Sequence, residues 1–171
     1  DARGAARRGR APAGAERRGG GDRVRMGGIA EPSDQELDDL DADILVLPGD
    51  TPLLRTETIT SLLDMHQQTD AACTLLTARV ADPTGYGRVV RGRDDRVERV
   101  VEQSDASEAE LAITEVNTSI YCFRASVLGP ALRRITPENA KGEYYLTDVV
   151  EVLAGAGYRV SAVVAADSAD T

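Results

Sequence analysis

The apolar and polar residues beyond residue 40 follow two kinds of pattern in succession. Residues 44–47 form a short uninterrupted apolar run, which is typical of a strand buried on both faces in a parallel sheet. Residues 55–69 then place apolar side chains three or four positions apart, and this spacing predicts an amphipathic helix. A second apolar run at residues 71–80 predicts another strand. The order strand, helix, strand is typical of an α/β protein.

The remaining segments continue this mixture of strands and helices. Apolar and charged residues alternate on both sides of an Arg-Asp-Asp turn, which predicts a hairpin. Further along, the patterns predict a strand, a short helix, an amphipathic helix that ends at glycine, and a last strand. These five segments are residues 87–103, 115–128, 126–135, 143–157 and 158–165. We therefore predict the α/β class, with a mixed sheet.

Charge divides the chain into two unlike regions. The net charge is −9, but residues 1–29 contain eight arginines and three acids, so they carry +5 and the other residues carry −14. Residues 1–35 consist largely of Ala, Arg and Gly without periodicity, which is typical of a disordered segment. Three interpretations stay open: GC-rich DNA translated out of frame, a flexible tail, or a basic arm for nucleic acid. The arm has no aromatic residue to stack on bases, so we expect no nucleic-acid partner.

The two cysteines, Cys73 and Cys122, lie in apolar, strand-like segments. We expect buried free thiols in a reducing cytoplasm rather than a disulfide. The chain has a single histidine, His66, and no cysteine cluster, which argues against a zinc site. It contains no apolar run of about 18 residues, so we expect no membrane span and no membrane partner.

A single acid, Asp50, follows the first apolar run, where Pro48 and Gly49 interrupt the strand pattern. In open α/β sheets, ligands bind beyond the carboxyl ends of the strands. A carboxylate at such an end could hold Mg²⁺, which takes oxygen ligands and commonly bridges to phosphate. The alternative is that Asp50 caps the following helix.

Four stretches together resemble a known family: LPGDTPLL, PTGYGRVVR, VVEQSDAS with EVNTSIY, and NAKGEYYLTDVV. Their order and spacing are similar to those of the uridyltransferase domain of the bacterial bifunctional N-acetylglucosamine-1-phosphate uridyltransferase/glucosamine-1-phosphate acetyltransferase. The resemblance covers roughly residues 36–171. It implies a Rossmann-like nucleotide-diphospho-sugar transferase fold with a mixed sheet. Residues 36–171 would then be a partial nucleotidyltransferase domain, preceded by the head of residues 1–35.

The resemblance also assigns roles at the nucleotide side and beside the sugar. It implies that Asp50 is the catalytic ligand of Mg²⁺, with Pro48 and Gly49 in the loop beside the nucleotide and sugar. Gly87 would contact the sugar through its backbone, because a residue without Cβ lets main-chain groups approach a ligand closely. An ordinary turn residue is the alternative for Gly87.

On the sugar side, the resemblance implies that Glu102 hydrogen-bonds sugar hydroxyls and that Asn117 orients the N-acetylglucosamine group. Tyr145 and Thr147 would lie close to the sugar and its phosphate. Each residue has a structural alternative. Glu102 could be a solvated charge at the end of a strand, and Asn117 a polar residue on a strand edge. Tyr145 could be a core residue, and Thr147 the N-cap of a helix. Ser119 stands where the family usually has glycine, which would tighten the sugar pocket.

The resembled enzyme joins UTP and N-acetylglucosamine 1-phosphate into UDP-N-acetylglucosamine and pyrophosphate, with Mg²⁺. Its full-length form also acetylates glucosamine 1-phosphate and forms a homotrimer through a C-terminal domain that this chain does not match. The family's N-terminal glycine-rich nucleotide loop lies before the matched region. We therefore expect the chain alone not to catalyse the transfer. Two alternatives are a related hexose-1-phosphate nucleotidyltransferase and a non-catalytic remnant that at most binds the sugar.

Overall fold

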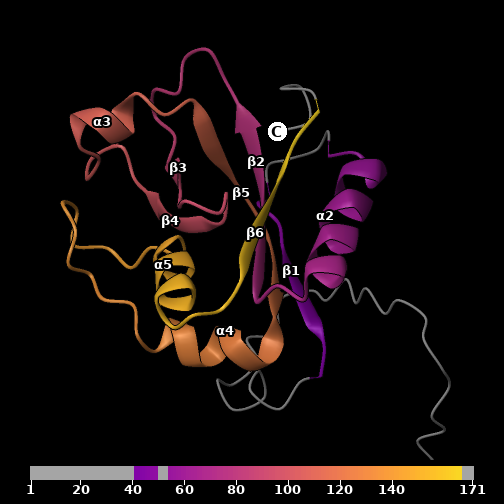
Figure 1. Ribbon diagram of the computed structural model, residues 1–171. Coiled ribbons are helices and arrows are strands. Elements are labelled where there is room, and N and C mark those ends of the chain that lie inside the picture. The colour runs from indigo at the N-terminus through magenta and orange to yellow at the C-terminus, as the bar shows by residue number, and fades with distance from the viewer. Residues whose placement is uncertain (1–40, 50–53, 167–171) are drawn as a thin grey trace, which may run out of the picture.

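The computed structural model describes residues 41–49 and 54–166 (Figure 1). Within these ranges the chain forms six strands and four helices. In chain order they are β1 (Asp43–Val46), α2 (Thr56–Thr69), β2 (Cys73–Arg79), β3 (Arg88–Arg91), β4 (Val97–Val101), α3 (Glu108–Leu111), β5 (Glu115–Arg124), α4 (Ala125–Leu132), α5 (Asp148–Gly155) and β6 (Val160–Val164). Every strand and helix expected from the sequence patterns between residues 55 and 165 is present.

The strands form one mixed sheet, as predicted, with the path β4-β3-β5-β2-β6 and β1 paired to β5. The central strand β5 runs antiparallel to β1, β2 and β3, whereas β2 and β6 run parallel. The charged turn between β3 and β4 makes the predicted hairpin, with Asp95 at a φ of 59°. Because β5 lies between β1 and β2, these two strands run in the same direction without pairing.

The first strand is less buried than its sequence predicts. Ile44, Leu45 and Val46 are only partly buried, and Leu47 is 40% exposed. Within the described ranges β1 pairs with β5 alone, so one of its edges has no neighbouring strand there. The expected burial on both faces is therefore wrong for this strand.

Alternating side chains give the sheet two apolar faces. Leu75 of β2 and Tyr121 of β5 belong to one core, which packs against α4 and α5. Leu76 and Cys122, one residue further along each strand, belong to a second core beneath α2. In Figure 1, α2 accordingly lies on the opposite side of the sheet from α4 and α5. Burial of these alternating residues fixes the register of β2 and β5.

Cys73 and Cys122 are both buried free thiols, which confirms the prediction against a disulfide. Burial raises the pKa of Cys122 to about 12 and raises the pKa of Cys73 as well. Burial also lowers the pKa of His66, against the opposite effect of Asp43. Among the residues that the structure describes, no helix has the length and apolar character needed to cross a membrane.

The short helix α3 was not expected from the sequence. It begins with a capping box: the Ser107 hydroxyl accepts from the Glu110 backbone N–H, and the Glu110 carboxylate accepts from the Ser107 backbone N–H. The Ser107 hydroxyl also donates to the Glu110 carboxylate, and this bond, the one from the Ser107 backbone N–H and a further one from Arg99 lower the pKa of Glu110 to about 2. Arg99 lies on β4, so the pair ties α3 to the hairpin.

Candidate substrate-binding site

Glu102 lies at the centre of the sequence-predicted sugar side. It directly follows β4, and its Oε1 accepts a hydrogen bond of 3.1 Å from the Thr147 hydroxyl. Thr147 occupies the N-cap position of α5, yet its hydroxyl makes no capping hydrogen bond. The Thr147 hydroxyl thus binds Glu102 instead of capping the helix. The helix-cap alternative is right about the position of Thr147 but not about its hydrogen bond. Glu102 is partly buried rather than a fully solvated strand-end charge.

Gly87 lies against Glu102 from the other side. A Cβ at this position would meet Val100 Cγ1 at 3.0 Å and Glu102 Oε1 at 3.3 Å. The positive φ of this loop belongs to Gly85, at 89°, so Gly87 is not needed as a turn residue. Its lack of a side chain instead makes room for the Glu102 carboxylate. Gly87, Glu102 and Thr147 therefore form one group, although they come from three separate motifs.

Asn117 joins this group through the backbone. Its N–H donates to the Gly87 carbonyl at 2.9 Å. Its side-chain Nδ2 donates to the Tyr121 hydroxyl at 2.7 Å, and its Oδ1 accepts from the Ser119 N–H at 3.3 Å. Asn117 is 6% exposed, so it is an oriented, buried amide and not a polar residue on an open strand edge. These bonds leave one amide N–H of Asn117 available to a ligand.

Ser119 adopts a left-handed backbone, with a φ of 62°. The register of β5 against β2 shifts here, because Leu76 pairs with Ile120 and Thr77 with Asn117. Two residues of β5 therefore bulge out of the ladder beside Asn117. A glycine would adopt this conformation without strain, which explains in physical terms why glycine is usual at this position in the resembled family.

Glu102 and Tyr145 line a cleft of about 510 Å³ between the end of β4, the loop before α5, and α5 itself. The Tyr145 hydroxyl is buried and has no hydrogen-bond partner among the described residues. Tyr145 as a whole is only partly buried, so it is a cleft residue rather than a core residue. An unpaired buried hydroxyl is costly unless a ligand or water satisfies it, which makes it a candidate ligand contact.

The sequence analysis did not single out four other acids that line this cleft, Asp105, Glu138, Asp148 and Glu151. Asp105 Oδ1 accepts from the Ala140 N–H at 2.7 Å and so holds the loop that carries Tyr145. Asp148, at the start of α5, has its pKa raised by burial and by the nearby acids Glu151 and Glu102. No spacing in the sequence links these residues, because 43 positions separate Asp105 from Asp148.

The loop before β3 is anchored by a buried arginine. Arg88 is 2% exposed; its Nη1 donates to the Tyr86 carbonyl and its Nη2 to Gln103 Oε1. The same Gln103 oxygen accepts from the Gly85 N–H. These contacts hold the segment that ends at Gly87 against Gln103, the residue after Glu102. Arg88 and Gln103 therefore position Gly87 beside Glu102, although neither of them lines the cleft.

Pro48 and Gly49 follow β1 at the end where Val46 pairs with Tyr121. Because β1 and β5 are antiparallel, this is the end of β5 that carries Asn117. Gly49 is exposed, and no atom of the described residues lies within 4 Å of the place where a Cβ would project. Asp50, the predicted metal ligand, lies outside the described residues.

The four-motif resemblance is confirmed by similar curated proteins. The bifunctional protein GlmU of Pelotomaculum thermopropionicum is 53% identical over 119 residues, and that of Limosilactobacillus fermentum is 51% identical over 126 residues. These matches cover 70% and 74% of this chain, but only 26% and 28% of the two relatives. The chain thus spans about a quarter of the length of the curated relatives it matches.

A solved structure supports the fold independently. The protein, assigned as a glucose-1-phosphate thymidylyltransferase from Bacillus anthracis and solved in complex with a sucrose, superposes with a TM-score of 0.58. The match covers 82% of this chain and 53% of that protein, at 19% identity. The likeness confirms the predicted Rossmann-like nucleotide-diphospho-sugar transferase fold with its mixed sheet.

The sequence profile of the nucleotidyl transferase family matches residues 26–171, which is most of the chain. The fold, the grouped motif residues and the relatives agree with this match. The protein therefore belongs to the nucleotidyl transferase family.

Proposed function

We propose that this chain is part of a uridyltransferase domain and supplies its sugar-phosphate side. The complete domain would join UTP and N-acetylglucosamine 1-phosphate and release pyrophosphate. The observation that carries the proposal is the group of Gly87, Glu102 and Thr147, which brings three family motifs together beside an open cleft. We place the protein in the cytoplasm, where such substrates are made and used.

In this proposal the cleft recognises the hydroxyl groups of the sugar. The Glu102 carboxylate accepts from sugar hydroxyls, while the unpaired Tyr145 hydroxyl is available to donate. The cleft contains five acids against two arginines, Arg99 and Arg134, so its net charge favours hydroxyl donors over phosphate oxygens. Asn117, held by Tyr121, offers its remaining amide N–H to the N-acetyl side.

We further propose that Asp50 holds Mg²⁺. Asp50 suits Mg²⁺ because a carboxylate supplies the oxygen ligand that this ion prefers. The proposal also rests on the course of β1, whose carboxyl end lies at the Asn117 end of β5. Bound Mg²⁺ would neutralise charge on the phosphate groups.

The reaction requires little covalent chemistry from the protein. A phosphate oxygen of the sugar phosphate attacks the α-phosphorus of UTP, and the bond to pyrophosphate breaks. Because the substrate carries its own nucleophile, the residues of this chain chiefly hold the sugar phosphate in line with the nucleotide. In agreement with this, no serine, cysteine or histidine is among the described residues that line the cleft.

A chimera tests the proposal. The matched segment of the L. fermentum protein would be replaced by the corresponding residues of this chain, with the parent enzyme as the control. We expect pyrophosphate release with UTP, N-acetylglucosamine 1-phosphate and Mg²⁺. Preference for dTTP with glucose 1-phosphate would favour the related hexose-1-phosphate nucleotidyltransferase. A folded but inactive chimera would favour the non-catalytic remnant.

The chain of 171 residues by itself should turn over far more slowly than the chimera. The family's glycine-rich nucleotide loop has no counterpart in the matched motifs, and Lys141 is the only lysine. The arginines of residues 1–35 are scattered among Ala and Gly without a regular spacing. A rate within about tenfold of the chimera, or about 1.4 kcal/mol in barrier, would contradict this expectation.

A further inference from the structure

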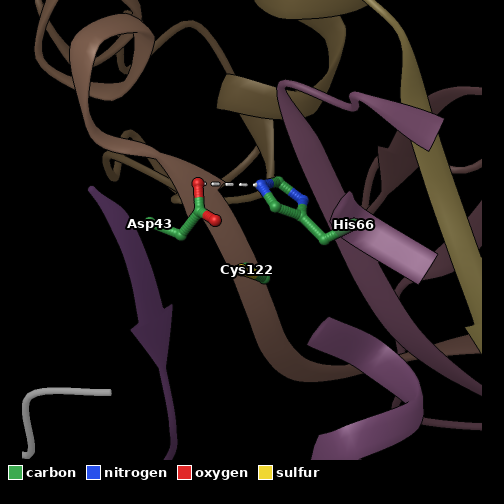
Figure 2. Close-up of side chains that lie close together, drawn as sticks. All are labelled: Asp43, His66 and Cys122. Atoms are coloured by element: carbon green, nitrogen blue, oxygen red, sulfur yellow. Dashed lines mark ion pairs between the residues drawn. The ribbon is translucent and has the colours of Figure 1, made fainter. Parts of the chain in front are cut away.

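Three metal-ligating side chains meet under α2, away from the cleft. They are Asp43 of β1, His66 of α2 and Cys122 of β5, and their ligand atoms all lie within 4.8 Å of one another. Figure 2 shows Asp43 and His66 facing each other, with Cys122 on the strand between them. His66 and Cys122 are buried, whereas the Asp43 side chain is 37% exposed. The group therefore has two ligands in the core and one at the surface.

His66 is oriented as a metal-binding imidazole would be. Its Nδ1 lies 2.8 Å from the Thr74 hydroxyl, which fixes the ring from behind. Its Nε2 is buried and makes no hydrogen bond of acceptable geometry, although Asp43 Oδ1 is 3.3 Å away. His66 is 97% buried, and this nitrogen faces the Asp43 carboxylate, so it is directed into the group. Histidine ligands commonly have the other ring nitrogen bonded in this way.

The separations suit a small tetrahedral ion. Zinc bond lengths of about 2.0–2.3 Å place neighbouring N and O ligands about 3.4 Å apart, and N and S ligands about 3.6 Å apart. The observed Nε2–Oδ1 distance of 3.3 Å already matches the first value. The remaining separations, at most 4.8 Å, need to shorten by up to about 1.2 Å to reach the second value.

We propose that Asp43, His66 and Cys122 bind Zn²⁺ or a similar divalent transition metal, with water as the fourth ligand on the exposed side of Asp43. The ligand set of thiolate, imidazole and carboxylate favours such an ion over Mg²⁺, which prefers oxygen alone. Cys122 releases its proton to solvent as the sulfur–metal bond forms. The ion would connect β1, α2 and β5, three elements that are remote from one another in the sequence.

This site is separate from the proposed substrate site. Asp43 lies at the end of β1 that pairs with Arg124, whereas Pro48 and Gly49 follow the other end. Cys122 projects into the core beneath α2, and the cleft with Glu102 borders α5 on the opposite side of the sheet. The proposed role is therefore to stabilise the fold.

Cobalt binding to the purified, reduced 171-residue chain tests the proposal. We expect Co²⁺ to produce the tetrahedral visible bands and a sulfur-to-cobalt charge-transfer band, and Zn²⁺ to displace it. Cys122→Ser should abolish the sulfur band, whereas Cys73→Ser, its matched control, should keep it, because Cys73 is equally buried but lies outside the group. A cation held only by oxygen ligands elsewhere would give no sulfur band.

Asp43→Asn supplies a second variant should Cys122→Ser fail to fold, since Asp43 is partly exposed. We expect it to weaken cobalt binding at least about tenfold, with Asp41→Asn as the control, and Thr74→Val to weaken binding roughly tenfold through loss of ring orientation. Zn²⁺ should also raise the unfolding temperature of the unmodified chain but not that of Asp43→Asn. No sulfur band in the unmodified chain, a band that survives in Cys122→Ser, or equal binding by Asp43→Asn and Asp41→Asn would overturn the proposal and leave a simple His66–Asp43 ion pair.

Discussion

The two ends of β5 support different chemistry. Near its beginning, Asn117 hydrogen-bonds Tyr121 and the backbone of Gly87, and Gly87 lies against Glu102, one of five acids in the cleft. Near its end, Cys122 joins His66 and Asp43 in a compact group with a soft sulfur ligand. The two residues are five positions apart in one strand, on the order of 15 Å.

The difference lies in how each end is built. The Asn117 end depends on short motifs in which a glycine, an acid and an amide occur at fixed spacing, so related chains can be compared there directly. The Cys122 end depends on single residues from three elements, which come together only when the sheet has formed. We therefore propose that one strand carries a site indicated by sequence motifs and another indicated by the fold alone.

The largest expected difference between the two ends comes from Asp50→Asn in the chimera. If Asp50 holds Mg²⁺, the change should lower pyrophosphate release by about 100-fold or more, equivalent to roughly 3 kcal/mol in barrier. In the 171-residue chain the same change should leave the sulfur-to-cobalt band intact. Activity close to that of the unmodified chimera would contradict the proposal that Asp50 binds Mg²⁺.

Glu115→Gln should reduce stability the most. Glu115 is 7% exposed and accepts two hydrogen bonds from Arg91, at 2.6 and 2.9 Å, and one from Thr77. Removing the charge of Glu115 leaves the Arg91 guanidinium with its contacts to the exposed Asp95 alone among those described here, so we expect a loss of about 3 kcal/mol in the free energy of unfolding. Urea denaturation measures this loss, with the exposed Glu98→Gln as the control.

Glu115→Gln also tests whether the two ends of β5 act separately, because Glu115 begins β5 two residues before Asn117. Sugar-phosphate binding should weaken in Glu115→Gln under conditions where the protein stays folded, while cobalt binding at the far end of β5 should change little. Equal losses at both ends would mean that the strand responds as one unit.

The sequence predicted the α/β class, the hairpin and the two main helices because their apolar periodicities are strong. Through the motifs it also assigned residues to the sugar side, and that assignment stays a prediction. It could not predict that the Thr147 hydroxyl binds Glu102, since 45 positions separate them. Nor could it predict the metal-ligating group, which depends on the pairing of Asp43 with Arg124 across β1 and β5. The partial burial of β1 likewise depends on its neighbours and not on its own apolar residues.

Glu102→Gln should affect the sugar-phosphate side alone. The substitution keeps the volume and the hydrogen bond from Thr147 but removes the charge that accepts from sugar hydroxyls. We expect kcat/KM for N-acetylglucosamine 1-phosphate in the chimera to fall by roughly tenfold or more, as for the loss of about 1–3 kcal/mol of charged hydrogen bonding. The exposed Glu108→Gln is the matched control. An effect confined to the KM for UTP would place Glu102 on the nucleotide side.

Ser119→Gly should produce the smallest change, and it should be stabilising. Ser119 has a φ of 62°, a left-handed conformation that costs an L-residue roughly 1–2 kcal/mol, whereas glycine adopts it freely. Glycine loses about 0.5–1 kcal/mol through its greater freedom in the unfolded chain, so the expected net gain is about 0.5–1 kcal/mol. The exposed Ser119 hydroxyl also contacts the Tyr121 hydroxyl, but Tyr121 keeps its hydrogen bond from Asn117. Ser126→Gly, in α4, is the control and should destabilise the protein, because its backbone is helical. A loss of stability in Ser119→Gly equal to that in Ser126→Gly would show that the bulge beside Asn117 is not strained.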